Sequence, residues 1–162
     1  MKIVLVRHAE AGSVGDPGVP CDADRPLTEF GRATAERLSA ALATHGYFFD
    51  ALVCSPLLRA RQTGEPLKRL LKTETGQFVV CDALAPDSRR PESVLETIEE
   101  LNAGQVLVVG HLPDIAVLAG MLIGVGAWAI EFDKGTAACF DCGGVPAVGS
   151  ATLTWLLSPE WY

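Results

Sequence analysis

The chain has 162 residues, 49% of them hydrophobic and 20% charged, which is the composition of one globular domain with a hydrophobic core. Its formal net charge of −7 at pH 7 argues against nucleic acid or an anionic membrane surface as the main partner. We therefore expect a single domain over residues 1–162.

Targeting signals are not evident in the sequence. Only four apolar residues lie between Lys2 and Arg7, too few for the core of a signal peptide. The longest apolar run, 115–130, is shorter than a membrane span and is interrupted by glycines, so it predicts a buried helix followed by a loop. Cys54 and Cys81 lie in apolar, strand-like runs, which favours reduced thiols. We expect a cytoplasmic monomer.

Strand-like and helix-like segments alternate along most of the chain. The apolar runs that predict strands are 3–6, 51–54, 78–81, 105–109, 136–142 and 151–157. Helices are predicted after Thr28, from Ser55-Pro56, from Pro91 and after Pro113, and Pro66 is expected to kink or break the second helix. This alternation favours an α/β fold of three layers (α/β/α), with a mainly parallel sheet of about six strands.

Three of the predicted strand-to-helix turns carry basic side chains. The first strand ends in Arg7 and His8, the second leads to a helix whose first turn holds Arg59, and the fourth ends just before His111. Turns of this kind emerge at one edge of a parallel sheet, where ligands bind, so the four side chains are expected to converge. For Arg7 and His8 taken alone, a simple cap on the end of a strand is the alternative interpretation.

This combination favours a phosphoryl group as the ligand. The planar fork of an arginine matches the oxygens of a phosphoryl group better than a lysine does. Helix N-termini at Ser55 and Pro113 are expected to point further dipoles at the same anion. A histidine among these donors can accept the phosphoryl group if its attacking nitrogen is unprotonated.

Four sequence blocks, taken together, resemble the histidine phosphatase superfamily, also called the phosphoglycerate mutase-like group. The blocks are Arg7-His8-Ala9, Arg25-Pro26-Leu27-Thr28 with Gly31, Ser55-Pro56 with Arg59-Ala60-Arg61-Gln62-Thr63, and Gly110-His111. They follow the family order over residues 3–113. The short length and the lack of long insertions look most similar to the SixA-type branch, whose members remove phosphate from phosphohistidine in signalling proteins.

The resemblance implies a role for each matching residue. His8 matches the nucleophile that becomes transiently phosphorylated, and Arg7, Arg59 and His111 match the rest of the phosphate pocket. Ser55 could add a hydrogen bond to the phosphate, although a role as helix N-cap explains it equally well. The resemblance implies no cofactor and no metal, since the cationic side chains supply the positive charge.

Two positions depart from the family pattern. Ala9 replaces the usual glycine but keeps a backbone carbonyl that can orient His8. Ester-cleaving members commonly carry a glutamate in an L-x-E pattern after the third strand, where this chain has Leu84-Ala85-Pro86. The adjacent Asp87 is either a candidate general acid or a solvated loop residue. Because imidazole is a far better leaving group than an alkoxide, a missing acid favours a phosphoramidate substrate.

We therefore predict a metal-independent histidine phosphatase that forms a covalent phosphohistidine on His8. Its expected substrate is phosphohistidine in a signalling protein, such as a histidine phosphotransfer domain. A small phosphorylated metabolite is the substrate if the chain is instead a phosphomonoesterase of the same fold. A catalytically silent phosphate-binding module is a third interpretation, and the intact set of two arginines and two histidines argues against it.

Overall fold

A central sheet dominates the computed structural model, which describes residues 1–72, 75–86, 88 and 90–162. The strands of this sheet are β1 (Lys2–Arg7), β2 (Ala51–Cys54), β3 (Gln77–Val80), β4 (Gln105–Gly110), β5 (Ala137–Asp141) and β6 (Thr152–Leu157). Their order across the sheet is β3-β2-β4-β1-β5-β6. Strands β3, β2, β4 and β1 are parallel, whereas β5 and β6 are each antiparallel to their neighbour. The prediction of a mainly parallel sheet is therefore confirmed.

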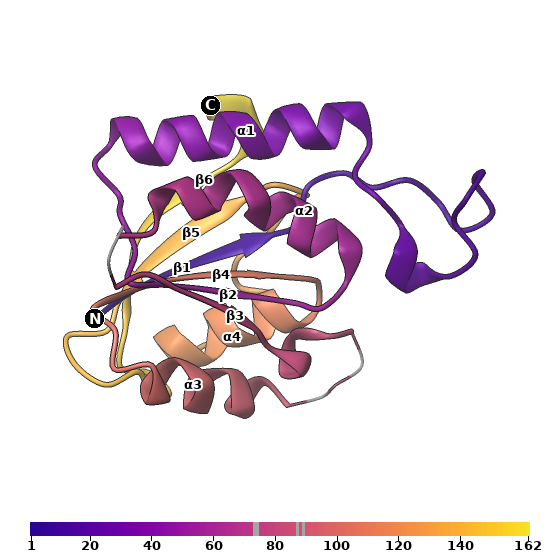
Figure 1. Cartoon of the computed structure of the whole chain (residues 1–162). Coiled ribbons are helices and arrows are strands. Elements are labelled where there is room, and N and C mark those ends of the chain that lie inside the picture. Colours follow the sequence, from indigo (N-terminus) through magenta and orange to yellow (C-terminus); the bar gives the residue numbers. More distant parts are fainter. Residues whose placement is uncertain (73–74, 87, 89) are drawn as a thin grey trace.

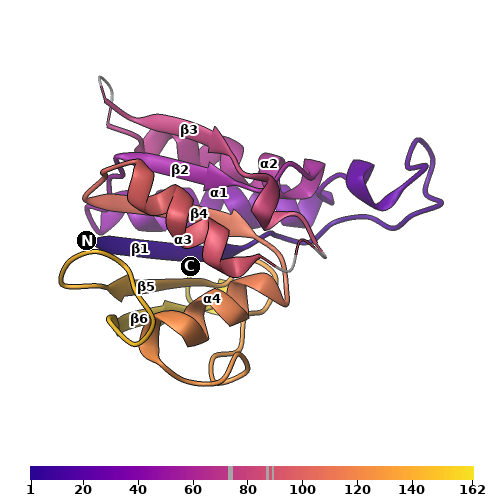
Figure 2. The same ribbon diagram turned by 90° about the horizontal axis from the view of Figure 1, so that it is seen from below.

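Helices cover both faces of the sheet. They are α1 (Glu29–Thr44), α2 (Leu58–Leu67), α3 (Pro91–Glu100) and α4 (Asp114–Ile123). Helices α1 and α2 lie on one face, and α3 and α4 lie on the other (Figures 1 and 2). Successive side chains of a strand point to opposite faces, so Ile3 and Leu5 belong to one core cluster, and Val4 and Val6 belong to the other. This arrangement confirms the predicted α/β/α layering.

Helix α1 begins and ends as its sequence predicts. The Thr28 hydroxyl accepts a hydrogen bond from the backbone N–H of Gly31 (3.0 Å), which caps the first turn. At the other end Gly46 has a φ of 73°, the left-handed conformation that stops a helix. The backbone N–H of Tyr47 then donates to the carbonyl of Leu42 (3.0 Å), which closes the last turn.

The predicted start of the second helix is wrong. Helix α2 begins at Leu58, so Ser55 and Pro56 are not its N-cap and first residue. The reason is that the backbone N–H of Ser55 continues the pairing of β2 with β4 one residue past the end of β2, because it donates to the carbonyl of Val109 (3.0 Å). The expected break at Pro66 occurs one residue later, since the helix includes Pro66 and ends at Leu67.

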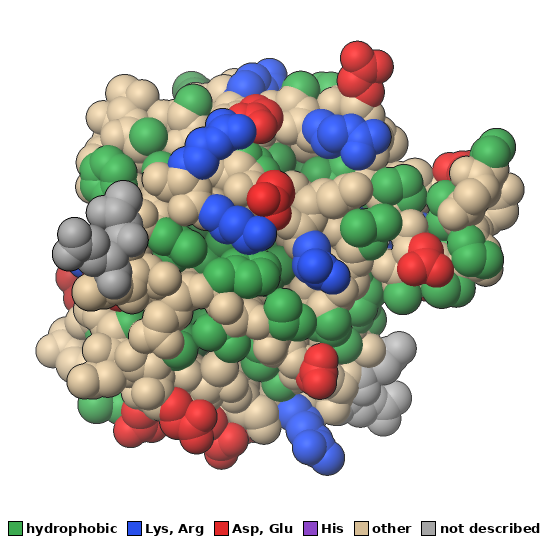
Figure 3. All heavy atoms as spheres, in the orientation of Figure 1, with side chains coloured by type: hydrophobic (Ala, Val, Ile, Leu, Met, Phe, Trp, Pro, Cys, Tyr) green, Lys and Arg blue, Asp and Glu red, His purple; other side chains and the backbone are tan. Residues whose placement is uncertain are grey.

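The apolar run 115–130 forms a buried helix and a loop, as predicted. Helix α4 ends at Ile123, and Gly124 follows with a φ of 74°. In the described part of the chain no helix is both long and apolar enough to cross a membrane. On the surface, Figure 3 shows acidic and basic side chains interspersed over α1 and α2. Arg69 and Glu36 form an exposed ion pair between the turn after α2 and α1.

A long loop, residues 10–25, extends away from the body of the molecule on the side to which the β1 arrow points (Figure 1). It contains a short 3₁₀ turn, Asp22–Asp24. The base of the loop is fixed by backbone hydrogen bonds from Thr28 N to Glu10 O (3.0 Å) and from Gly12 N to Pro26 O (2.9 Å). The loop therefore leaves the sheet beside the start of α1.

The first turn of α1 packs against this loop so closely that only glycine fits at position 31. A Cβ atom on Gly31 would lie 2.0 Å from the carbonyl oxygen of Glu10. The contact involves backbone on both sides, so no side-chain rotation can relieve it. Gly31 thus fixes the distance between α1 and the residues that follow His8.

Replacing Gly31 by alanine is expected to destabilise the fold, because the helix must move away from Glu10. We expect a loss of about 2 kcal/mol or more, equivalent to a Tm lowered by about 4–8 °C for a chain of this size. Thermal unfolding followed by circular dichroism measures it.

Gly64→Ala is the matched control. A Cβ at Gly64, inside α2, would lie 3.5 Å from the Cys54 sulfur, an ordinary contact. Alanine there should be neutral or should stabilise the helix by up to about 1 kcal/mol. Equal Tm values for Gly31→Ala and the parent protein would contradict the close-approach argument.

Candidate active site

The pairing of β1 with β4 brings two histidines to the same edge of the sheet. In this parallel pair Arg7 is opposite Gly110. The backbone N–H of His8 continues the ladder by donating to the carbonyl of Gly110 (3.0 Å). His8 and His111 therefore leave the sheet side by side, with their ring centroids 4.9 Å apart.

The His8 ring is held with one nitrogen occupied. Its Nδ1 lies 2.7 Å from the carbonyl oxygen of Ala9, which can only accept, so Nδ1 carries the proton. The side chain is 7% exposed. Burial lowers the pKa of His8 to about 4, the charges of Arg59, Arg7 and Lys134 act in the same direction, and the bond to Ala9 opposes them. His8 is thus neutral at pH 7, with the lone pair on Nε2.

His111 forms a hydrogen bond with Ser55, the residue expected from the sequence either to bind phosphate or to cap a helix. Its Nε2 lies 2.8 Å from the hydroxyl of Ser55, and both side chains are buried. The pKa of His111 is lowered to about 3, chiefly by burial, and His8 in its protonated form and the charges of Arg59 and Arg7 act in the same direction. Nδ1 of His111 is buried and has no hydrogen-bond partner among the described residues.

Arg59 projects from the first turn of α2 and is bound by a carboxylate of the loop. Its Nη1 donates to the backbone carbonyl of Asp22 (2.7 Å), and its Nη2 donates to Oδ2 of the same residue (3.0 Å). Arg25 donates to the other carboxylate oxygen of Asp22 (2.9 Å). The hydrogen bonds from Arg25 and Arg59 hold the pKa of Asp22 below its usual range. Asp22 therefore lies where an anionic ligand would meet Arg59.

Arg7 is fixed from the opposite side. Its Nη1 donates to the backbone carbonyl of Phe132 (2.7 Å) in the segment between α4 and β5. Its Nε is buried without a hydrogen-bond partner among the described residues. Burial lowers the pKa of Arg7, while the negative charge of Asp133 acts in the opposite direction.

Thr63 explains why residues 59–63 appear as one block in the sequence. Its hydroxyl donates to the carbonyl of Arg59 (2.8 Å) and accepts from the backbone N–H of Ala9 (3.1 Å). Gln62 accepts a hydrogen bond from the backbone N–H of Leu27 (2.7 Å). These side chains tie α2 to the residue after His8 and to the base of the loop, so they position the site.

The structure therefore brings Arg7, His8, Arg59, His111 and Ser55 together. Asp87, the candidate general acid, lies outside the described residues. Among the residues that are described, no cluster of three or more His, Cys, Asp or Glu side chains could hold a metal ion.

Sequence reasoning missed Asp22 and the carbonyl of Phe132. Their contacts join residues 37 and 125 positions apart, so no local pattern could reveal them.

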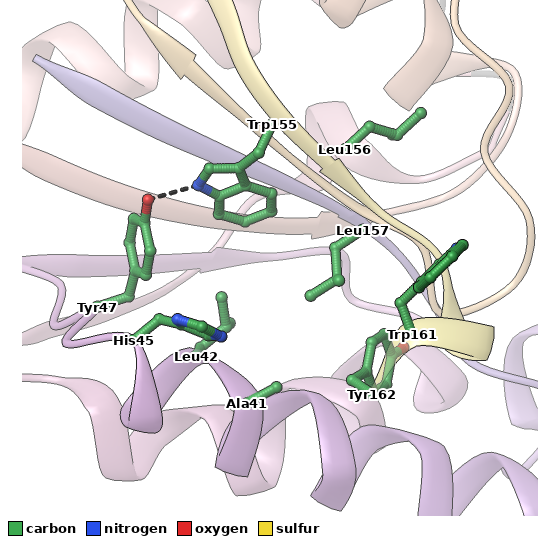
Figure 4. Close-up of a pocket in the computed structure, with 9 residues that line it drawn as sticks. All are labelled: Ala41, Leu42, His45, Tyr47, Trp155, Leu156, Leu157, Trp161 and Tyr162. Atoms are coloured by element: carbon green, nitrogen blue, oxygen red, sulfur yellow. Dashed lines mark hydrogen bonds between the residues drawn. The ribbon is translucent and has the colours of Figure 1, made fainter.

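An aromatic cavity of about 390 Å³ lies elsewhere, between α1, β6 and the chain end (Figure 4). Its lining residues are Ala41, Leu42, His45, Tyr47, Trp155, Leu156, Leu157, Trp161 and Tyr162. Within it the indole N–H of Trp155 donates to the hydroxyl of Tyr47. None of the converging basic residues lines this cavity, so it is separate from the candidate active site.

Comparison with known sequences identifies one family. The sequence profile described as the histidine phosphatase superfamily (branch 1) matches residues 3–85. A protein of Picosynechococcus sp. of uncharacterized function is 34% identical over 118 residues, 71% of this chain and 68% of that protein. The mitochondrial serine/threonine-protein phosphatase Pgam5 of Drosophila simulans is 37% identical over 79 residues, 49% of this chain and 26% of that protein. This chain thus matches about a quarter of the length of Pgam5.

Solved structures resemble the whole chain. The protein histidine phosphatase SixA complexed with tungstate has a TM-score of 0.83 and 25% identity, over 99% of this chain and 98% of that chain. A structure from Agrobacterium tumefaciens assigned as a SixA phosphohistidine phosphatase has a TM-score of 0.79 and 28% identity, over 98% and 97% of the two chains. The similarity covers β5 and β6 as well as the residues of the site.

Both site histidines are expected to be neutral under physiological conditions, because burial disfavours the charged ring. Long-range ¹H–¹⁵N NMR correlations should show His8 as the Nδ1–H tautomer at pH 6.5. Protonation midpoints should lie near 4 for His8 and near 3 for His111. His8→Ala and His111→Ala assign the signals. A midpoint near 6.5 for either ring would contradict the burial argument.

Removing the carboxylate of Asp22 is expected to strengthen anion binding, because Asp22 competes for Arg59. Asp22→Asn should lower the Kd for inorganic phosphate by roughly 3–10-fold, which corresponds to the loss of one partly exposed ion pair. Isothermal titration calorimetry measures the change. Asp24→Asn is the control. Asp24 is an exposed residue of the same loop, and its carboxylate accepts a hydrogen bond from Cys21, whereas the carboxylate of Asp22 binds Arg59. Equal effects of the two variants would show only a general charge effect.

Proposed function

Since the chain belongs to the histidine phosphatase superfamily, we propose that it is a phosphatase that transfers a phosphoryl group first to Nε2 of His8 and then to water. The observation that carries this proposal is the state of His8. Its ring is neutral, its Nδ1 proton is held by the Ala9 carbonyl, and its Nε2 lone pair is therefore available for attack.

The surrounding cations would stabilise the transferred group. The guanidinium groups of Arg7 and Arg59 supply positive charge close to His8. A Ser55 hydroxyl that donates to Nε2 of His111 leaves the proton of that neutral ring on Nδ1, where it can donate to a phosphoryl oxygen. Because these groups provide the charge, the reaction we propose requires no metal ion.

The reaction proceeds in two displacements. In the first, the lone pair of Nε2 forms a bond to phosphorus, and the bond between phosphorus and the leaving atom breaks with its electrons going to the leaving group. In the second, a water oxygen attacks the phosphorus of phosphorylated His8. The bond between Nε2 and phosphorus then breaks, its electrons return to Nε2, and a proton of the water passes to phosphate or solvent.

The proposed substrate is phosphohistidine in a protein. SixA, the structural neighbour with a TM-score of 0.83, is a protein histidine phosphatase and binds tungstate, a tetrahedral oxyanion like phosphate. The Leu84-Ala85-Pro86 sequence, which lacks the glutamate of the ester-cleaving pattern, also favours a leaving group that needs little help from an acid. We further propose that the protein acts in the cytoplasm on a phosphorylated signalling protein, such as a histidine phosphotransfer domain.

A phosphate ester is the second candidate substrate, either on a protein or on a small metabolite. The 79-residue similarity to Pgam5, a serine/threonine-protein phosphatase, supports it. An ester releases an alkoxide, so this reaction depends on a proton donor close to the leaving oxygen. Relative turnover of a phosphohistidine peptide and a phosphoserine peptide of the same sequence separates the two candidates.

The covalent step is tested by trapping the phosphoenzyme. Incubation with a ³²P-labelled phosphohistidine peptide, followed by rapid quenching in base, should give an acid-labile, base-stable label on the parent protein. His8→Ala should lose the label, and kcat should fall by about 10⁴-fold or more, as expected for removal of a nucleophile.

His45→Ala is the matched control, because His45 is exposed and lies at the end of α1 in the separate aromatic cavity. It should retain both the label and the turnover. A label that persists in His8→Ala would overturn the mechanism. Binding of phosphate without turnover of any donor would instead identify a silent binding module.

A further inference from the structure

A second cavity borders the candidate active site. It has a volume of about 290 Å³ and is lined by Arg7, Leu112, Trp128, Ile130, Glu131, Phe132 and Asp133. Most of these residues belong to the segment between α4 and β5, which curls beside α4 in Figure 2. Leu112 directly follows His111 in sequence. A group attached to a phosphoryl group at Arg7 would therefore have this cavity next to it.

The wall of the cavity is anchored to the catalytic edge of the sheet. Phe132 is 2% exposed, and its carbonyl accepts the 2.7 Å hydrogen bond from Arg7. The backbone N–H of Gly135 contacts the carbonyls of Arg7 (3.1 Å) and His8 (3.3 Å). The residues on either side of Phe132, Glu131 and Asp133, thus have fixed backbone positions relative to Arg7.

The wall of this cavity places negative charge next to Arg7, an arginine of the proposed phosphate site. Glu131 and Asp133 are both exposed, and Asp133 is close enough to raise the pKa of Arg7 against the effect of burial. Trp128 is 73% exposed, so its large apolar ring lies open to solvent. Carboxylates together with an open indole ring form the kind of surface that binds an organic cation.

We propose that this cavity receives the leaving group and selects a protonated aromatic ring, with Trp128 against the face of the ring and Glu131 and Asp133 near its charged edge. This inference rests on the proposed phosphatase function and names its specificity-determining residues. A phosphohistidine side chain with a protonated imidazole has both required properties.

The protonation state also explains how such a substrate reacts without a nearby acid. Phosphorus on one ring nitrogen leaves the other ring nitrogen free to carry a proton. When Nε2 of His8 attacks, the electrons of the breaking bond stay on the nitrogen that held phosphorus. The imidazole then leaves as a neutral molecule that keeps its proton. Carboxylates that stabilise the imidazolium form thereby increase the reactive fraction of the substrate.

Three small substrates separate the two parts of the proposal. The leaving group of N-phosphoimidazole is aromatic and is cationic when protonated. The leaving group of phosphoramidate is cationic when protonated but is not aromatic. The leaving group of p-nitrophenyl phosphate is aromatic and departs as an anion. All three substrates carry the same phosphoryl group. A variant that changes how Arg7 binds this group therefore affects all three kcat/KM values alike, and the effect cancels in their ratios.

The double variant Glu131→Gln, Asp133→Asn should lower the N-phosphoimidazole to p-nitrophenyl phosphate ratio by roughly 5–20-fold, since it removes two charges from a partly exposed site. Trp128→Leu should lower the N-phosphoimidazole to phosphoramidate ratio by roughly 3–10-fold, since it removes the aromatic face. Trp161→Leu and Glu160→Gln are matched controls at exposed positions near the chain end, and they should leave both ratios unchanged.

Unchanged ratios in both cavity variants would overturn the inference and leave the phosphatase function intact. If the parent protein turns over none of the three substrates, the phosphohistidine peptide still decides the proposed function, and the cavity is judged by ligand binding. In that case imidazole at pH 6, where most of it is protonated, is titrated into the protein by calorimetry. Binding that weakens in the double variant supports the cation site, and absence of binding refutes it.

Discussion

Strands β1 and β4 are parallel neighbours, and their pairing places Arg7 opposite Gly110. One further hydrogen bond, from the N–H of His8 to the carbonyl of Gly110, carries this pairing past the end of β1. Both histidines are consequently placed by the sheet and not by a loop. A shift of the pairing by one residue would turn the β1 side chains to the opposite face, which would move His8 away from His111. The position of His8, the proposed nucleophile, is thus set by the same strand pairing that forms the core.

The same placement sets the electrostatics of the site. Rings that emerge at the edge of a buried sheet, between two layers of helices, lose most of their contact with water. Burial is the main reason that the pKa values of both histidines are low, and the neighbouring arginines contribute in the same direction for both rings. The fold therefore keeps the two imidazoles neutral beside two guanidinium groups. In the proposed mechanism, the group that attacks is therefore different from the groups that carry positive charge.

The sequence was informative wherever a feature depended on local order along the chain. Apolar runs predicted the strands, Thr28 predicted the start of α1, and the rule that parallel strands present their turns at one edge predicted the convergence of Arg7 and His111. The start of α2 was mispredicted because Ser55-Pro56 is a good local signal for a helix. A hydrogen bond from the backbone N–H of Ser55 to Val109 instead extends the strand pairing past Cys54 and delays the helix.

Contacts between distant segments had no such local signal. Two hydrogen bonds of the site depend on the path of two loops. Arg59 donates to the carboxylate of Asp22, and Arg7 donates to the carbonyl of Phe132. The composition of those loops shows only that they are polar or mixed. The sequence of these loops does not show which carbonyl or carboxylate contacts an arginine of the site. Family resemblance could identify the two arginines, but it could not show which loop atoms bind them.

The contact between Asp22 and Arg59 has a consequence for the selection of anions. A carboxylate attached to the same chain has a high effective concentration at its partner, at the millimolar level or above for a short connection. Chloride and other monovalent anions carry no more charge than this internal competitor and cannot form the same paired hydrogen bonds. A phosphoryl dianion brings more charge and more acceptor oxygens, which Arg7 and His111 can also engage. The loop carboxylate is therefore expected to disfavour monovalent anions at Arg59 more than a phosphoryl dianion.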